Sequence, residues 1–364
     1  MSRLSNNVNF SIVGFGGIAR THALGAYMGN IKFPLDYSLN LKSTVTRKPM
    51  DFKIAGTENY TNIDDILSDD TIDFVDICTP NNAHFEILKK AVEAGKAVYC
   101  EKPLSSSLED SIEMEKLVRE SKLKNAVALI YRYMPAVRLI KSAVEDNLIG
   151  DIIDFKIKLY HKSYLNPNKK GSWRTKQSSG GGALVDLGVH LIDAIHFTLG
   201  KVKEVECDTR VFFKDRTNVD EIAYCKMNMR SGARGSLEVS RIFAEKDEPT
   251  TYVLYGTKGS IKMSSNEPYF IEVYNYEDNK VEKISSIKND KLADFYPKER
   301  DSLGFHQDCH SACIVNFANS VFTGDDCENI AKFRDSLNAE IVIDACYKSD
   351  REKKPVQVDY REDL

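Results

Sequence analysis

The chain has 364 residues, which is enough for two domains that each bury a hydrophobic core. Lysine and arginine total 50 and aspartate and glutamate 54, so the formal net charge is only −4. Both signs are spread along the chain without a long run of either. This pattern excludes a polybasic arm, and we expect no nucleic-acid partner.

Membrane insertion and secretion are also disfavoured. The most apolar long stretch, Gly180 to Gly200, contains Asp186, His190 and Asp193, so it does not resemble a membrane-spanning helix. The apolar run Val8 to Val13 leads into glycines without a cleavage-like region, and we expect no signal peptide. The eight cysteines are scattered and include no CxxC pair. We therefore expect reduced thiols, a cytoplasmic protein and no membrane partner.

A glycine-rich turn opens the chain. The apolar run Asn9 to Val13 leads into Gly14-Phe15-Gly16-Gly17-Ile18-Ala19, and helical spacing follows through Tyr27. This is the strand, turn and helix order of a dinucleotide fingerprint, in which small residues let the backbone approach a pyrophosphate at a helix start. We expect the cofactor to contact Gly14, Phe15, Gly16, Gly17 and Ile18.

Strands and helices then alternate, as a parallel, doubly wound sheet requires. Helices are expected over Ile63 to Leu67, Ala83 to Ala94 and Ser107 to Lys122, between strands at Ser38 to Thr46, Phe74 to Cys78, Ala97 to Cys100 and Ala126 to Ile130. We expect an α/β Rossmann domain over residues 1–131 that binds NAD or NADP.

The end of the second strand bears on the choice of cofactor. An NAD site usually carries an acidic residue there, but this strand ends in Thr46-Arg47-Lys48. Two cations and a hydroxyl suit a 2′-phosphate, so Thr46 and Arg47 favour NADP(H). The alternative is a solvated turn in which Arg47 only stacks on adenine, and NAD(H) therefore stays open.

Consecutive strand-like runs without intervening helices dominate the second part of the chain. They predict an α+β domain over residues 132–364 with a large, mostly antiparallel open sheet, followed by helices at Ser302 to Phe322 and Ile330 to Tyr347. One face of the sheet should carry the helix Gly182 to Leu199. The other face is free to pair with a second subunit, which predicts a homodimer or a homotetramer.

Polar residues recur on the otherwise apolar helix of this domain. Asp186 and His190 are four residues apart, so both project from one face, and Asp193 lies near the same line. Burying such a stripe is costly unless it is paired or functional. Two interpretations are open: an ion-pair arrangement near a helix start that follows three glycines, or a catalytic pair.

Two further motifs make the pattern specific. Cys78-Thr79-Pro80-Asn81-Asn82-Ala83-His84 and Glu101-Lys102-Pro103 stand at the carboxyl ends of successive predicted strands, where open α/β sheets bind ligands. Together with GFGGIA and the run from Gly180 to Asp193, they resemble the Gfo/Idh/MocA family of oxidoreductases, over nearly the whole chain. The resemblance implies hydride transfer between nicotinamide and a secondary carbinol of a sugar, inositol or related polyol.

The resemblance also implies roles for individual residues. Thr79, Pro80, Asn81 and His84 would line the nicotinamide ribose. Glu101-Lys102-Pro103, often with a cis bond before the proline, would place Lys102 between cofactor and substrate. The implied catalytic residues are Lys102, Asp186 and His190, with His190 as general base. The expected substrate contacts are Arg132, Trp173, Arg174, Asp186 and His190. Arg132 could instead hold the cofactor carboxamide or the fold, and Trp173 with Arg174 could be surface packing, although the resemblance favours a pocket role.

Other interpretations remain beside this one. The family includes glycosidases that use bound NAD for transient oxidation, and relatives that serve only as nucleotide-sensing regulators. A regulator should lack Lys102 or the Asp186/His190 pair, and this chain retains all three. His306, Cys309, His310 and Cys313 have some metal-like spacing but form no HExxH motif, so we expect a packed helix beside the substrate pocket and no metal.

Overall fold

The computed structural model describes residues 6–169, 175–176, 179–285 and 295–361. The chain forms two compact units: Met1–Tyr133 with Leu292–Leu337, and Met134–Lys291 with Asn338–Leu364. The segment Leu292–Leu337 thus belongs to the same compact unit as the N-terminal residues.

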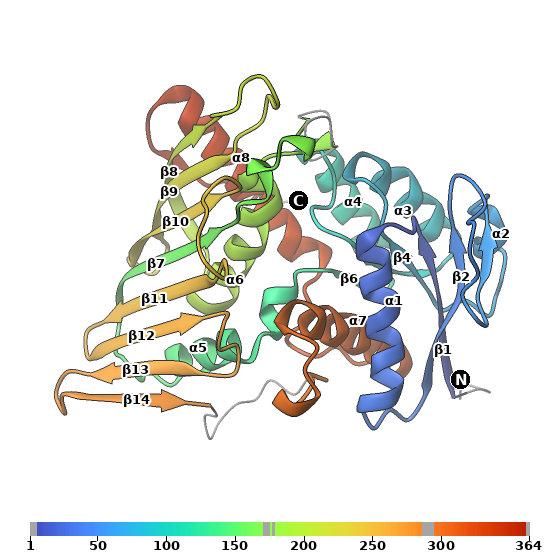
Figure 1. Cartoon of the computed structure of the whole chain (residues 1–364), viewed down its shortest axis with the longest axis horizontal. Coiled ribbons are helices and arrows are strands. Elements are labelled where there is room, and N and C mark those ends of the chain that lie inside the picture. The colour runs from blue at the N-terminus through green and yellow to red at the C-terminus, as the bar shows by residue number, and fades with distance from the viewer. Residues whose placement is uncertain (1–5, 170–174, 177–178, 286–294, 362–364) are drawn as a thin grey trace. The chain divides into compact units, whose positions relative to one another are not determined.

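The first unit contains a six-stranded parallel sheet of order β3-β2-β1-β4-β5-β6 (Figure 1). This is the Rossmann order, and it confirms the predicted parallel, doubly wound sheet. All four residues of β4 and all four of β5 are buried, because helices cover both faces. The strands are β1 (Asn7–Val13), β2 (Ser38–Val45), β3 (Glu58–Tyr60), β4 (Phe74–Ile77), β5 (Ala97–Cys100) and β6 (Asn125–Val127).

A helix from late in the chain completes this unit. A Cβ atom on Gly29 of α1 would lie 2.5 Å from Cγ2 of Val315 in α7, so glycine permits the close approach of the two helices. Phe317 of α7 stacks on Tyr99 of β5 with ring centroids 5.6 Å apart. The helices are α1 (Gly17–Lys32), α2 (Asp64–Leu67), α3 (His84–Glu93), α4 (Leu108–Ser121) and α7 (Phe305–Thr323), with short 3₁₀ turns at Asn81–Ala83 (η1), Ile130–Tyr133 (η2) and Glu299–Asp301 (η8).

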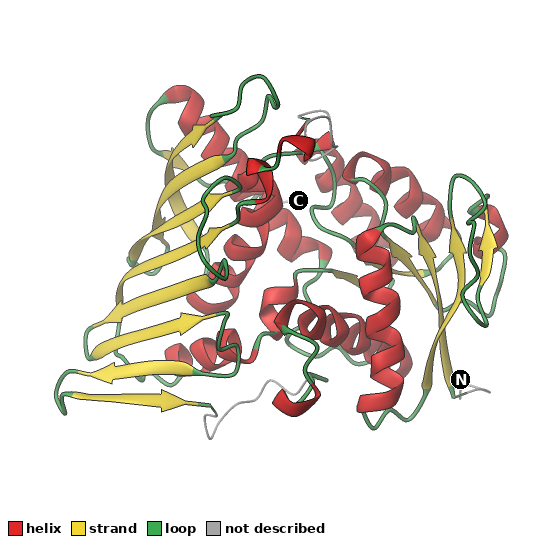
Figure 2. Ribbon diagram, viewed as in Figure 1, coloured by secondary structure: helices red, strands yellow, loops and turns green. Residues whose placement is uncertain are grey.

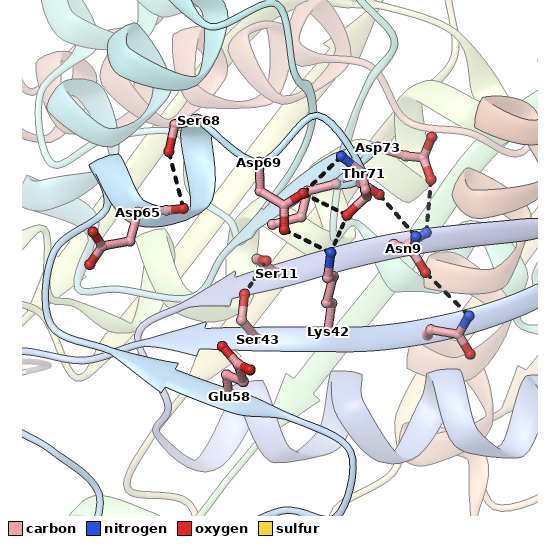
Figure 3. A network of polar contacts seen from close by, with 12 residues as sticks. Asn9, Ser11, Lys42, Ser43, Glu58, Asp65, Ser68, Asp69, Thr71 and Asp73 are labelled. Carbon is pink, nitrogen blue, oxygen red and sulfur yellow. Dashed lines mark hydrogen bonds and ion pairs between the residues drawn. The ribbon is translucent and has the colours of Figure 1, made fainter.

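Polar side chains tie β1 and β2 to the loop before β4 (Figure 3). Nζ of Lys42 lies 2.7 Å from a carboxylate oxygen of Asp69, and the backbone N–H of Asn9 donates to Asp73 at 2.8 Å. The hydrogen bond from Lys42 lowers the pKa of Asp69 to about 2. These contacts fix the amino-terminal side of the β4 segment, at whose other end the predicted cofactor residues begin.

The second unit contains a nine-stranded sheet of order β14-β13-β12-β11-β7-β10-β9-β8-β15 (Figure 2). Its neighbouring strands run antiparallel except for the pair β7 and β10, so the predicted, mostly antiparallel sheet is confirmed. The strands are β7 (Ile152–Tyr160), β8 (Val202–Arg210), β9 (Ile222–Met229), β10 (Arg234–Ser240), β11 (Thr250–Gly256), β12 (Gly259–Ser264), β13 (Ile271–Asn275), β14 (Lys280–Ile284) and β15 (Val356–Gln357).

Alternating burial along these strands separates a covered face from an open one. The open face carries aromatic side chains that include Tyr255, which is 39% exposed. The helical segments of this unit are α5 (Pro135–Glu145), the 3₁₀ turns η3 (Ser163–Leu165) and η4 (Pro167–Lys169), the π-helical turn η7 (Leu184–Gly188), α6 (Val189–Leu199) and α8 (Phe333–Glu352), whose first residues belong to the other unit.

Two general expectations can be compared with the described chain. None of its helices is both long enough and apolar enough to cross a membrane. All eight cysteines lie in described segments and none forms a disulfide. Seven of them are buried, and only Cys327 is partly exposed.

Candidate cofactor and catalytic residues

The glycine turn presents bare backbone at the start of α1. Gly16 is the N-cap residue, and no side chain caps this end of the helix. Gly14 has a φ of +86°, and a Cβ atom there would lie 2.9 Å from the carbonyl oxygen of Cys78. A Cβ atom on Gly16 or Gly17 would meet nothing within 4 Å. The turn therefore offers open space and N–H groups to an anion, as a pyrophosphate requires.

An apolar pocket of about 390 Å³ lies beside this turn. The ring centroids of Phe15 and Phe52 are 6.3 Å apart, and the Arg20 guanidinium lies 5.3 Å from the centre of the Phe52 ring. Sequence reasoning missed Phe52, which lies in a loop without regular spacing. Beyond the end of β2, Thr46 donates from its hydroxyl to the Lys48 carbonyl at 2.7 Å, and Arg47 is exposed.

The loop after β4 holds the residues predicted around the nicotinamide ribose. Oγ1 of Thr79 is buried, and the described residues offer it no hydrogen-bond partner, which suits a hydroxyl of a bound ligand. Pro80 precedes the turn η1, which Asn81 begins. His84 is fully buried, with Nε2 2.8 Å from the Thr79 carbonyl and Nδ1 3.0 Å from the Leu104 carbonyl. Its ring therefore links the loop after β4 to the loop after β5.

The turn after β5 presents one lysine. The Lys102–Pro103 peptide bond is cis, as the resemblance implied. Glu101, Pro103 and Leu104 are buried, whereas Lys102 is partly exposed. The backbone N–H of Lys102 donates to Oε2 of Glu101 at 3.2 Å. The fold thus sets Lys102 at the carboxyl edge of the sheet, where ligands of such sheets bind.

A buried charge cluster that sequence reasoning missed lies behind this turn. His22 of α1 is fully buried, with Nδ1 2.9 Å from Asp76 and Nε2 3.1 Å from Glu101. Burial lowers the pKa of His22, but Asp76 and Cys78 together outweigh burial, and the net pKa lies well above the usual value. Burial raises the pKa of Glu101, yet His22 brings it down to about 2. We conclude that an imidazolium holds two buried carboxylates.

The late helix α7 contributes a second histidine to this cluster. The rings of His22 and His310 are 5.2 Å apart, whereas His306 is exposed. Ligand atoms of His22, Glu101 and His310 lie within 4.8 Å of one another, a spacing that could hold a metal ion. Both ring nitrogens of His22 already face carboxylates. We therefore interpret the trio as ion-paired and keep the expectation of no metal.

In the second unit, Asp186 and His190 lie on the segment that was predicted to be one helix. The segment begins with the π-helical turn η7, which contains Asp186, and continues as α6, which contains His190 and Asp193. Asp186 is 7% and His190 9% exposed, and Asp193 is fully buried. Single π turns inside helices are frequent at functional sites. The predicted helical segment is confirmed, but its first turn is wider than an α-helix.

Two further residues position this segment, and sequence reasoning named neither. The Arg241 guanidinium, which follows β10, forms an ion pair with the Asp186 carboxylate. Oδ2 of Asp220 accepts from the N–H of Leu184 at 2.8 Å, and Oδ1 accepts from the Tyr347 hydroxyl at 2.6 Å. Burial raises the pKa of Asp220 to about 6. No local motif marks either residue, because their partners are remote in sequence.

Of the remaining predicted substrate residues, the structure describes Arg132 alone. Arg132 is 6% exposed, and its Nη2 lies 3.1 Å from a carboxylate oxygen of Asp335 in α8. This ion pair agrees with the interpretation that Arg132 holds the fold. Trp173 and Arg174 lie outside the described residues.

The strand order and the glycine turn define the first unit as a dinucleotide-binding Rossmann domain. Comparison with protein families adds the particular family. Residues 8–129 match the model described as "Oxidoreductase family, NAD-binding Rossmann fold", and residues 141–358 match "Oxidoreductase family, C-terminal alpha/beta domain". The chain belongs to the Gfo/Idh/MocA family of oxidoreductases.

Individual relatives are similar over most of their length. Levoglucosan dehydrogenase from Pseudarthrobacter phenanthrenivorans is 30% identical over 301 residues, which is 74% of each chain. Glucose-6-phosphate 3-dehydrogenase from Bacillus subtilis is 26% identical over 360 residues, covering 95% of this chain and 97% of the relative. A solved structure of levoglucosan dehydrogenase with NADH superposes with a TM-score of 0.87 at 25% identity, over 97% of this chain and 99% of that one.

Proposed function

We propose that this oxidoreductase transfers a hydride between nicotinamide and a secondary alcohol carbon of a sugar, inositol or related polyol. The observation that carries the proposal is the turn after β5, where Lys102 is partly exposed between buried neighbours at the ligand-binding edge of a Rossmann sheet. The printed names of two relatives, levoglucosan dehydrogenase and glucose-6-phosphate 3-dehydrogenase, support the substrate class.

The dinucleotide, when bound, supplies the hydride acceptor or donor. Gly14, Gly16 and Gly17 would accommodate its pyrophosphate, and the buried Thr79 hydroxyl would meet a polar group of its ribose. Pro80, Asn81, His84 and Glu101 belong to the same proposed cofactor region through the two loops that follow β4 and β5.

Three residues would act on the alcohol. His190 would take the hydroxyl proton as general base, and Lys102 would donate a hydrogen bond to the reacting oxygen. Asp186 would orient His190 or accept from a neighbouring substrate hydroxyl. The ion pair with Arg241 supports this role, because a guanidinium favours an ionised, accepting carboxylate. Arg132, Trp173 and Arg174 remain proposed substrate contacts, with Arg132 the weakest of them because it pairs with Asp335.

We also propose a preference for NADP(H) over NAD(H). Arg47 and Lys48 are exposed beyond the end of β2, so their cations are available to a 2′-phosphate. Arg47→Ala should weaken NADP(H) binding about 10- to 100-fold, the loss expected for one charged hydrogen bond, and should change NAD(H) binding much less. Isothermal titration with both cofactors tests this preference, and tighter binding of NAD(H) by the unaltered protein contradicts it.

Self-association and cellular location form part of the proposal. The open face of the second sheet includes Val253 and Tyr255, of which Tyr255 is 39% exposed. A homodimer or homotetramer that buries this face would remove such side chains from water. A monomeric mass by light scattering at micromolar concentration would contradict it. The free cysteines support a reducing compartment such as the cytoplasm.

The test of the function is a panel of sugars, inositols and polyols assayed by reduced-nicotinamide absorbance with each cofactor. A dehydrogenase produces stoichiometric reduced cofactor as substrate is oxidised. A glycosidase that uses bound NAD would convert substrate without net change in the absorbance, and a nucleotide-sensing regulator would bind cofactor without turnover. Either of these results would replace the proposed reaction.

A further inference from the structure

Three cysteines from three separate elements meet inside the second unit. Cys207 lies in β8, Cys225 in β9 and Cys346 in α8, and their sulfurs all lie within 4.8 Å of one another. Cys207 and Cys225 face each other in the strand register, with their sulfurs 3.3 Å apart. All three are at least nine-tenths buried. The proposed hydride transfer uses none of them.

The sulfur of Cys207 faces two other thiols. The Cys225 sulfur lies 3.3 Å from it, and the Cys346 sulfur lies within 4.8 Å of both. The backbone N–H of Cys207 is already satisfied by Oγ of Ser349 at 3.1 Å. A thiolate is the form of cysteine that binds metals, whereas buried thiols that merely fill space remain protonated.

We propose that Cys207, Cys225 and Cys346 form a binding site for one soft, thiophilic d¹⁰ metal ion. Sulfurs at about 2.3 Å from a shared ion stand roughly 4 Å apart, which the observed cluster can reach by small side-chain shifts. Soft sulfur donors select ions such as Cu⁺ over Mg²⁺ or Ca²⁺. Three sulfurs suit Cu⁺ or Cd²⁺ better than structural Zn²⁺, which takes four protein ligands.

The cluster also has a route to solvent. A hollow of about 420 Å³ is lined by Cys207 and Cys225 together with Ser349, Lys353 and Lys354. An ion can enter through this hollow, and the protons displaced from the thiols can leave by it. The lining balances Lys226, Lys353 and Lys354 against Glu206, Asp208 and Glu238, so the hollow carries no net charge of its own.

The experiment titrates Cd²⁺ into the reduced, full-length protein and follows the thiolate-to-metal absorption, with native mass spectrometry for stoichiometry. We expect one tightly held ion and a higher melting temperature, because an ion that binds only the folded state stabilises it. Cu⁺ added without oxygen should displace the Cd²⁺. Oxidation of Cys207 and Cys225 to a disulfide by added peroxide, which is reduced to water, should abolish binding.

Variants separate this site from the other thiols. Cys346→Ala should weaken Cd²⁺ binding on the order of 100-fold and remove the rise in melting temperature. The controls are Cys313→Ala, which removes a buried cysteine of the first unit, and Cys327→Ala, which removes the partly exposed cysteine. Both controls should keep the Cd²⁺ affinity and the rise in melting temperature. If Cys346→Ala does not fold, Cys207→Ala at the hollow serves in its place. Absence of the absorption in the unaltered protein, or equal binding by the Cys346→Ala or Cys207→Ala variant, overturns the proposal.

Discussion

Each unit holds a nearly buried carboxylate within its part of the proposed site, but the two carboxylates pair with different cations. In the first unit His22 contacts Glu101, which precedes Lys102, and in the second Arg241 contacts Asp186. A guanidinium stays protonated throughout the pH range in which proteins are folded, whereas an imidazolium can lose its proton. The two arrangements should therefore respond differently to pH, although both fix a carboxylate.

The largest expected effect comes from removing the cation of the first unit. His22→Leu would leave Asp76 and Glu101 buried without their shared partner, so we expect a loss of about 3–5 kcal/mol in the free energy of unfolding of that unit. Thermal and denaturant melts measure it. His306→Leu, an exposed histidine of α7, is the control and should change little. Equal effects of the two substitutions would show that the buried cluster is not held by charge.

The pH dependence of the same cluster has a definite sign. The pKa of His22 is raised, so its stabilisation is complete below its unfolded value of about 6.5 and is lost as pH rises through the folded value. The pKa of Glu101 is lowered to about 2, so its stabilisation is complete above about 4.5 and is lost as pH falls towards 2.

The difference in melting temperature between the unaltered protein and His22→Leu should therefore be greatest and flat between about pH 4.5 and 6.5. It should shrink on both sides of this range. Melting curves at one-unit pH steps check this shape. A difference that rises between about pH 4.5 and 6.5 and stays flat above pH 7 would mean that His22 is neutral in the folded protein.

Asp220 is a third buried carboxylate, and none of its hydrogen-bond donors in the described part of the chain is a cation. Its donors include the Tyr347 hydroxyl and a backbone N–H group, whereas Asp186 pairs with the Arg241 guanidinium. Burial raises the pKa of Asp220 to about 6, so the folded state holds a proton that the unfolded state has released above about pH 4. Stability should fall by about 2–3 kcal/mol as pH rises from 4 to 6 and then level off. Asp220→Asn should remove this slope, and an unchanged slope in that variant would assign it to another group.

Breaking the ion pair between Arg241 and Asp186 should cause a smaller loss in the free energy of unfolding. This loss should not depend on pH through the cation, because the guanidinium does not titrate. Arg241→Met should cost about 1–3 kcal/mol of unfolding free energy, since it leaves a nearly buried carboxylate without its charged donor. The deficit should stay constant between about pH 7 and pH 9, where a guanidinium does not titrate. Arg241→Lys should recover part of it. A deficit that disappears over this range would contradict the comparison.

The features that sequence reasoning found are local ones. A few neighbouring residues are enough to recognise each of these features. They are the glycine turn, the strand ends at Thr79 and Glu101, and the stripe of Asp186 and His190. Three-residue β3 and the polar β14 carry no apolar alternation, so they were not predicted. Even the predicted helix at Leu184 begins as a π turn, a local detail that helical spacing does not distinguish.

The contacts that sequence reasoning missed join remote positions. His22 meets Asp76 across 54 residues, and Arg241 meets Asp186 across 55. Helix α7 was predicted as a helix, but its return to α1 depends on the space left by Gly25 and Gly29. Periodicity along the chain describes which face of an element is buried, and it does not say which other element covers that face.

The proposed role of His190, which is to take the proton of the reacting alcohol, can be tested by a single kinetic comparison. With saturating cofactor and a substrate that the unaltered enzyme oxidises, His190→Ala should lower kcat by about 10² to 10⁴, while the Kd for the cofactor stays nearly unchanged. Adding Lys102→Ala should cost less than the product of the single losses, because both residues act on one transition state. Full kcat in His190→Ala would contradict the claim and leave His190 a structural residue of α6.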